Sequence, residues 1–197
     1  MLSNESIDLR ANLEILVRER GKLKEHRLYH NIFPYVGLTW LSHLISGDLS
    51  NYLSKTGAGI GGYKQSNPIA DVSPLTVYPT IGARSQTDTD MNVVWLERPV
   101  AISSASYPIS QGDDVWLKAT TSTDYVAVNK TRLIFIFTEA EVSFSDFDIV
   151  PITELGLFTS DQDVLQRTNQ LVAYKCFEPL NKTTVMEIEV RWTITLG

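Results

Sequence analysis

The segment MEIEVRWTITL, residues 186–196, alternates strictly between apolar and polar side chains. A period of two places successive side chains on opposite faces of an extended strand. The segment therefore predicts a β-strand that has one face on a hydrophobic core and the other in water. Just before it, the pair Asn181-Lys182 predicts a turn.

Short β-rich runs separated by Gly, Pro, Ser, Thr, Asn and Asp precede this segment, at 93–96, 115–117, 132–138, 152–158 and 171–177. The run at 132–138 is apolar on both faces, which is typical of a strand buried on two sides. Parallel strands need crossover connections of a dozen or more residues, usually helical, and no helix-length apolar pattern separates these runs. The sequence therefore predicts a mainly β protein, an antiparallel β-sandwich or jelly-roll-like domain.

The N-terminal residues 1–30 are rich in charge of both signs, with six Lys or Arg and five Asp or Glu. Leu9, Leu13 and Leu16 follow a helical spacing, Ser6 can cap such a helix, and Gly21 can end it. We therefore predict a helical arm over residues 1–30. Because a short isolated helix is marginal in water, the arm must lean on the body or on a neighbouring subunit.

The remaining residues 31–197 form one predicted domain. A second, short helix is expected near 37–46, where leucines at 38, 41 and 44 share a face and Gly47 follows. Residues 57–90 are rich in Gly and Pro, so they predict a long loop. Such a loop is either an interface element or an exposed linker.

Length and composition limit the function classes. The chain has 197 residues, a net charge of −6 and one Cys, so it predicts one domain without an intrachain disulfide or a Cys-rich metal framework. The acidic balance argues against nucleic acid as a partner. We expect no membrane association, since no apolar run approaches ~18 residues. The polar start at residues 2–6 is unlike a secretory signal, which indicates synthesis in a cytoplasm.

Several motifs offer only weak evidence of chemistry. The run GAGIGG at 57–62 matches G-x-G-x-x-G but lacks the strand before it and the helix after it that bind a dinucleotide. On a helix, His26 and His30 would share a face and could bind a metal, but a third ligand is missing nearby, and His43 belongs to the second helix. Cys176 lies in an apolar run and predicts a buried structural residue rather than a nucleophile.

Acidic pairs could hold calcium or serve glycoside hydrolysis, but turn formation is the favoured interpretation. They are Asp88/Asp90, Asp113/Asp114, Asp146/Asp148 and Asp161/Asp163. The sequence therefore predicts no catalytic, cofactor-binding or metal-binding residues, and it predicts that the protein is not an enzyme.

An ordered set of short stretches resembles small structural proteins of tailed bacteriophages. The stretches are VRERGK at 17–22, HNIF at 30–33 leading into GLTWL at 37–41, GIGG at 59–62, TDTD at 87–90, LERPV at 96–100, DDVWL at 113–117, ITELGLF at 152–158, LVAY at 171–174, KT at 182–183 and WTI at 192–194. The resemblance implies a β-sandwich virion protein without catalytic activity. It implies self-association and docking onto capsid, neck or tail proteins, and it leaves position, copy number and symmetry open.

Two other functions remain as alternatives. A carbohydrate-binding or receptor-recognition module of a phage particle could use aromatic side chains to stack on sugars, the candidates being Tyr63, Tyr78, Trp95, Tyr107 and Trp116. A hydrolase is the other alternative, although a recognisable catalytic constellation is missing. We expect a homo-oligomer located in the virion.

Overall fold

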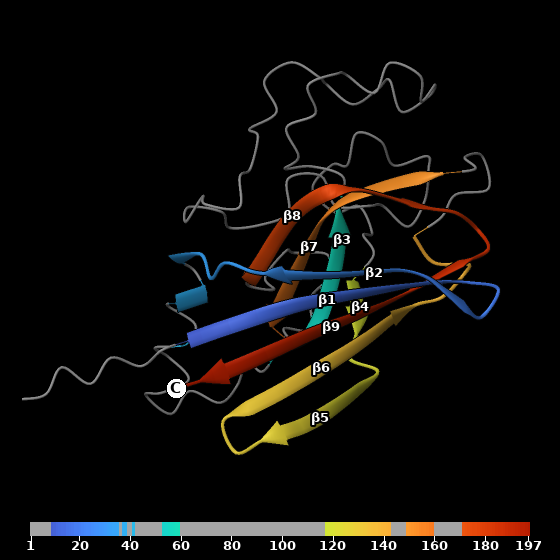
Figure 1. Cartoon of the computed structure of the whole chain (residues 1–197). Helices are drawn as coiled ribbons and strands as arrows, with labels where there is room; N and C mark the ends of the chain where they lie inside the picture. Colours follow the sequence, from blue (N-terminus) through green and yellow to red (C-terminus); the bar gives the residue numbers. More distant parts are fainter. Residues whose placement is uncertain are drawn as a thin grey trace, which may run out of the picture.

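The protein is mainly β, and its described strands form two antiparallel sheets (Figure 1). The computed structural model describes residues 9–35, 37–38, 41, 53–59, 117–142, 149–159 and 171–197. Nine strands lie within these residues. The predicted antiparallel β architecture is confirmed for this part of the chain.

The larger sheet has five strands in the order β2-β1-β9-β6-β5. Their bounds are β1 (Leu9–Glu19), β2 (Lys22–His30), β5 (Ser122–Ala127), β6 (Lys130–Phe137) and β9 (Met186–Leu196). The predicted C-terminal strand is confirmed as the central strand β9, which pairs with β1 along its whole length and with β6 on its other side. Its apolar side chains are buried from Met186 to Trp192, as the alternation predicts, whereas Leu196 is exposed. The polar face is not fully in water, because Glu189 and Thr193 are also buried.

The smaller sheet has four strands in the order β4-β3-β7-β8. Their bounds are β3 (Leu53–Gly59), β4 (Leu117–Ala119), β7 (Val150–Thr159) and β8 (Leu171–Lys182). The predicted strands at 152–158 and 171–177 are confirmed as parts of β7 and β8. Because β8 continues to Lys182, the predicted turn at Asn181-Lys182 is wrong, and the turn lies at residues 183–185.

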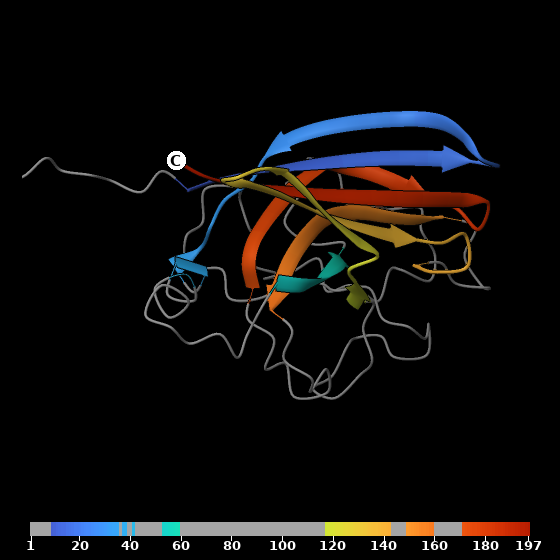
Figure 2. The same ribbon diagram turned by 90° about the horizontal axis from the view of Figure 1, so that it is seen from below.

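The larger of two hydrophobic clusters among the described residues lies between the inner faces of the two sheets. The larger sheet contributes side chains such as Ile15, Phe135 and Trp192, and the smaller sheet contributes Leu157 and Phe177 to the same cluster. Figure 2 shows the smaller sheet beneath the larger one. The two-sided burial predicted for 132–138 is only partly found, because alternate side chains of β6 are fully buried and those between them are half-buried.

The helical arm predicted for residues 1–30 is wrong in its described part, because residues 9–30 form the β1–β2 hairpin. The spacing of Leu9, Leu13 and Leu16 fits a helix. A second pattern with a period of two, Leu13, Ile15 and Val17, competes with it, and these three side chains are buried in the core. Pairing with β9 decides between the two patterns.

The hairpin turn explains why the strand pair is hidden in the sequence. Arg20 and Gly21 both have positive φ, 50° and 76°. Positive φ at both central residues is the geometry of a two-residue turn whose twist matches the flanking strands. Asn or Asp is usual at the first position of such a turn, so the arginine at position 20 does not indicate a turn in the sequence. Gly21, expected to end a helix, instead supplies the second residue of the turn.

The remaining predictions for the N-terminal half fall partly outside the described residues. Of the helix predicted at 37–46, residues 37, 38 and 41 are described and helical, and Leu38 N–H donates to the Pro34 carbonyl at 3.1 Å. Of the loop predicted at 57–90, residues 57–59 belong to β3, and the rest lies outside the description. The run at 93–96 also lies outside it, as do residues 115 and 116 of the next run.

Edge strand β2 of the larger sheet and the segment that follows it contact β8, an edge strand of the smaller sheet. Arg27 donates hydrogen bonds to the carbonyls of Glu178 at 2.6 Å and Pro179 at 3.2 Å, both in β8. Ile32 then exchanges backbone hydrogen bonds with Tyr174 at 3.1 and 3.0 Å. These contacts join edge strand β2 and the segment after it to edge strand β8.

Candidate functional site

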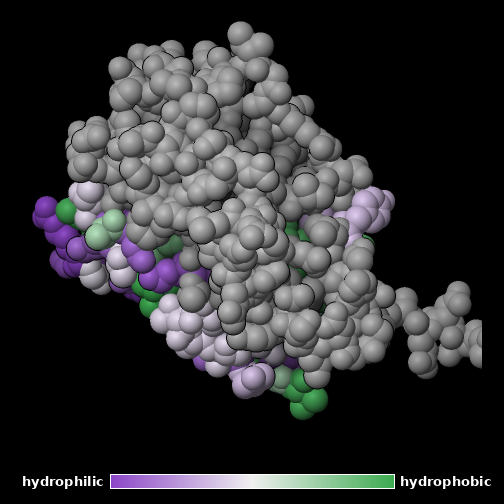
Figure 3. Space-filling view, turned by 180° about the vertical axis from the view of Figure 1, so that it is seen from behind, coloured by the Kyte–Doolittle hydropathy of each residue, from purple (hydrophilic) through white to green (hydrophobic). Residues whose placement is uncertain are grey.

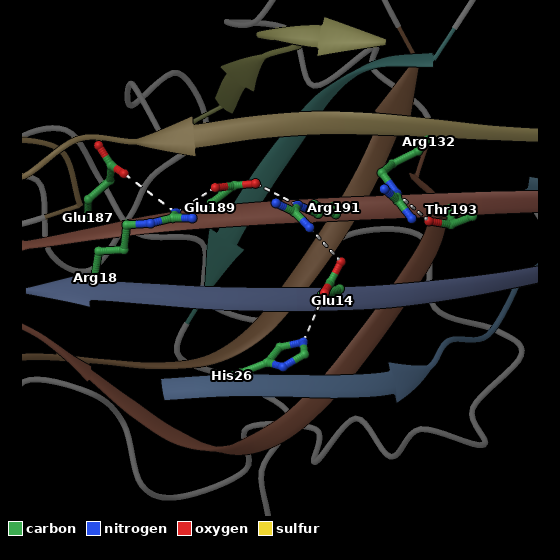
Figure 4. A network of polar contacts seen from close by, with 8 residues as sticks. All are labelled: Glu14, Arg18, His26, Arg132, Glu187, Glu189, Arg191 and Thr193. Carbon is green, nitrogen blue, oxygen red and sulfur yellow. Dashed lines mark hydrogen bonds and ion pairs between the residues drawn. The ribbon is translucent and has the colours of Figure 1, made fainter. Parts of the chain in front are cut away.

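The outer face of the larger sheet, which points away from the core, carries a network of charged side chains (Figure 4). Arg18 Nη1 lies 2.5 Å from Glu189 Oε2, and Arg191 Nε lies 2.5 Å from Glu189 Oε1. Arg191 also contacts Glu14 at 3.2 Å, and His26 Nε2 lies 2.9 Å from the other oxygen of Glu14. The network crosses β2, β1 and β9, because the polar side of each strand faces outward.

Glu189 is the centre of this network and its most buried member, since its side chain is 10% exposed. Burial alone would raise the pKa of its carboxyl group, but hydrogen bonds from Arg18 and Arg191, together with their charges, lower it. Glu189 therefore stays ionised and holds the two arginines in place. The network, completed by Glu187 at 3.9 Å from Arg18, pairs charges of opposite sign with one another.

This arrangement is better suited to structure than to chemistry. Both oxygens of Glu189 accept hydrogen bonds from guanidinium groups, so neither is poised to move a proton. In the part of the chain that the structure describes, no cluster of three His, Cys, Asp or Glu residues could hold a metal ion. The outer face therefore presents a polar surface whose strands are cross-linked by ion pairs.

A second cluster of charges lies where the β6–β7 loop meets β4 and β8. Lys118 in β4 contacts both carboxylate oxygens of Glu141, at 2.7 and 2.8 Å. The same carboxylate accepts a hydrogen bond from the Thr138 N–H at 2.8 Å. Beside it, the buried Lys182 donates hydrogen bonds to the carbonyls of Glu139 and Thr183, both at 2.9 Å. These contacts fasten the loop to two strands of the smaller sheet, β4 and β8.

The tip of the β5–β6 hairpin is the clearest apolar surface among the described residues. Tyr125, Val126 and Val128 are exposed, and we call these three residues the hairpin tip. Asn129 anchors the turn, because its side chain donates to the Leu196 carbonyl at 2.7 Å and its own carbonyl accepts from the Leu196 N–H at 2.9 Å. Hydrophobic atoms mark this end of the molecule at the lower edge of Figure 3.

Strand β5 of this hairpin is not among the strands predicted from the sequence. The available signal was the apolar run Tyr-Val-Ala-Val at 125–128, in which tyrosine and the two valines favour a strand. It was too short and too close to the β6 segment to stand out. These side chains are exposed because β5 is an edge strand of the sheet, and strand order is not encoded in the local sequence.

The histidines considered as metal ligands are not brought together. His26 and His30 lie on β2 rather than on a helix, and four residues along a strand span roughly 13 Å. His26 contacts Glu14, and His30 Nδ1 lies 2.7 Å from Asn12 Oδ1. Each of the two histidines therefore contacts a polar side chain of β1.

Other candidates are placed only in part. Cys176 lies in β8, opposite Glu154 of β7, and it is half-buried rather than fully buried. In the run at 57–62, residues 57–59 form the end of β3. His43, the four acidic pairs and the five aromatic candidates for sugar stacking lie outside the described residues. Among the described residues, no helix is long and apolar enough to cross a membrane.

Comparison with known proteins adds no relative. No protein family matches the chain, and neither a curated protein nor a solved structure matches it significantly. The functional interpretation therefore depends on the residues and their geometry.

Proposed function

We propose that this chain is a non-enzymatic structural protein of a tailed-bacteriophage virion. It assembles by self-association and by docking onto capsid, neck or tail proteins. The ordered resemblance described above, from residues 17–22 to residues 192–194, supports the phage assignment. The antiparallel β architecture agrees with the body that this resemblance implies.

We further propose that the body is a β-sandwich. Side chains of both sheets meet in one hydrophobic cluster, with Trp192 and Phe135 from one sheet and Leu157 from the other. In a sandwich the two inner faces supply the core and the outer faces stay polar. The ion pairs around Glu189 give the larger sheet a polar outer face of this kind.

The observation that carries the assembly proposal is the apolar hairpin tip. Tyr125 is 83% exposed, and Val126 and Val128 stand beside it, at the end of a strand whose six residues are all exposed. Exposed apolar side chains clustered on one element mark protein–protein contacts more often than scattered ones do. Tyrosine is also enriched at such contacts.

Quantitative mass spectrometry of purified particles tests the proposal, using the virus that encodes the chain. The protein should remain with the particles through a density gradient, in a fixed ratio to the main capsid protein. Deleting its gene should give incomplete particles, and supplying the gene in trans should restore them. Complete, infectious particles that lack the protein would exclude a structural role. Specific binding on a glycan array by a protein missing from particles would favour the carbohydrate-binding alternative.

A further inference from the structure

We propose that two copies of this chain associate by antiparallel pairing of β5 with β5, which makes the larger sheet continuous across the dimer. The inference deepens the proposed function, on which it rests, because it names the edge through which copies assemble. Strand addition at a sheet edge satisfies backbone donors and acceptors that otherwise face water.

The four sheet edges differ in how open they are. Arg27 and the Ile32–Tyr174 bridge link edge strands β2 and β8. The third edge strand, β4, has three residues and offers little length for pairing. By contrast, β5 has six residues, all exposed, and its outer edge has no partner strand in the described part of the chain.

The composition of the edge strands points the same way. Natural proteins protect exposed edges with lysine or proline, which discourage pairing with another chain. The edge strand β2 carries Lys22 and Lys24, so two copies of β2 would bring like charges together. The sequence of β5, STDYVA, contains neither lysine nor proline. Its bulge, between Tyr125 and Ala127, leaves the stretch before it regular.

Charge also permits β5 to meet a second copy of itself. Asp124 is the single charged residue of the strand, and it lies opposite Arg132 of β6 in the same sheet. A two-fold axis perpendicular to the sheet places one residue of β5 opposite its own copy, and with the axis at Thr123, Asp124 lies opposite Ser122 of the second copy, so the two aspartates do not face each other. Thr123 and Tyr125 then supply the remaining contacts, and cross-strand pairs of this kind are favourable.

Strand direction selects the partner edge. Every neighbouring pair in the five-stranded sheet is antiparallel, so β2 and β5 run in the same direction. If a second copy in the same orientation placed its β2 beside β5, the two strands would be parallel. If the second copy were turned over so that the strands became antiparallel, its polar outer face would lie on the core side of the first copy. A two-fold axis perpendicular to the sheet pairs β5 with β5 antiparallel and keeps both polar faces on one side. The resulting contact uses the same surface on both copies and is closed.

The expected affinity of this contact is low. A pair of six-residue strands with the hairpin tips buries less than the ~1,200 Å² at which standard-size interfaces begin. The dimer should therefore be transient in dilute solution. In a particle with many copies, repeated weak contacts are reinforced because neighbouring sites are held at high effective concentration.

Analytical ultracentrifugation of the purified full chain tests the proposal. The protein concentration should run from roughly 1 µM to roughly 1 mM, because a weak dimer is populated only at high concentration. We expect a concentration-dependent dimer. The variant Tyr125→Lys should raise the dissociation constant of the dimer by at least about tenfold, because it places a lysine on the pairing edge. The matched control is Leu28→Lys on β2, a leucine that is 67% exposed at the opposite edge, and it should leave association unchanged.

Hydrogen exchange adds an independent measurement. Amides of β5 should exchange more slowly at high protein concentration, while those at the outer edge of β2 should not change. Circular dichroism of both variants checks that each is folded. A monomer at every concentration would overturn the proposal. A dimer that resists Tyr125→Lys but is lost with Leu28→Lys would overturn it as well.

The result separates this inference from the proposed function. A monomeric chain that is still found in particles leaves the structural role intact and excludes the β5 contact. A β5 dimer of a protein that is missing from complete, infectious particles excludes the virion role while the contact stands.

Discussion

At the scale of single residues, the burial of Lys182 sets a pH dependence. Its side chain is fully buried at the end of β8, and burial lowers its pKa from 10.5 to about 8, although the carboxylates of Glu139 and Glu141 favour the charged form. The unfolded chain therefore binds more protons than the folded one between about pH 8 and 10.5. The free energy of unfolding should rise with pH across that window.

The variant Lys182→Met tests this pH dependence. The rise contributed by Lys182 is at most roughly 3 kcal/mol, and it should be smaller because two carbonyls also stabilise the charged amine. Urea unfolding at pH 7.5 and pH 10 measures the change for both proteins. We expect the gain in stability to be smaller in the variant. Equal changes in the two proteins would show that Lys182 titrates normally.

A glycine illustrates how closely two elements can approach. A Cβ added at Gly37 would lie 2.1 Å from the Val172 carbonyl oxygen, too close for any other residue. The sequence suggested Gly37 only as the start of a helix, because steric conflict with a distant strand leaves no local pattern. Contacts of this kind follow from tertiary packing and cannot be derived from neighbouring residues.

At the scale of elements, Arg27 joins the edges of the two sheets. Its guanidinium group spans two carbonyls of β8 and also lies 5.9 Å from the centre of the Phe177 ring. Lysine cannot reproduce this forked geometry. We therefore expect Arg27→Lys to lower the free energy of unfolding by about 1–2 kcal/mol and to speed hydrogen exchange in β2.

A second arginine supplies the control for this prediction. Arg132 makes one long hydrogen bond, 3.4 Å, to Thr193 on the outer face of the larger sheet. Because that contact lies within one sheet, Arg132→Lys should change stability by less than about 0.5 kcal/mol. Equal effects of the two substitutions on stability and exchange would show that Arg27 does not hold the sheets together.

The strands differ in how well local sequence predicts them. In β9 the alternation has one interpretation, and the strand was predicted correctly. In β1 two periodicities share Leu13, and the helical one was chosen wrongly. The partner strand that resolves the conflict lies more than 160 residues away, as the pairing of Leu13 with Trp192 shows. Register over such distances leaves no trace in the sequence of β1 itself.

The same limit applies to the candidate site. The polar side of β9, with Glu189 and Arg191, is evident from the alternation of residues 186–196. Its partners Glu14 and Arg18 are four residues apart and fit a helical surface equally well. Only the register of β1 against β9 brings these four side chains together. The open edge at β5 likewise depends on strand order, which periodicity does not encode.

At the scale of the whole molecule, strand order determines where the chain can be divided. The sequence predicted a boundary between an arm at 1–30 and a domain at 31–197. In the structure, β1 lies between β2 and β9 and contributes Leu13, Ile15 and Val17 to the core. The N-terminal hairpin is thus part of the larger sheet.

Separating the chain at this boundary tests that conclusion. A protein of residues 31–197 should fail to unfold cooperatively on heating, because β9 loses a partner along all of its eleven residues and the core loses three buried side chains. Adding a peptide of residues 9–30 should restore a cooperative transition, as monitored by circular dichroism. The same peptide with Ile15→Asp should not, since it would bury an unpaired charge. If residues 31–197 alone unfold cooperatively and the peptide changes nothing, the N-terminal segment is a separable arm and the pairing of β1 with β9 is not required for the fold.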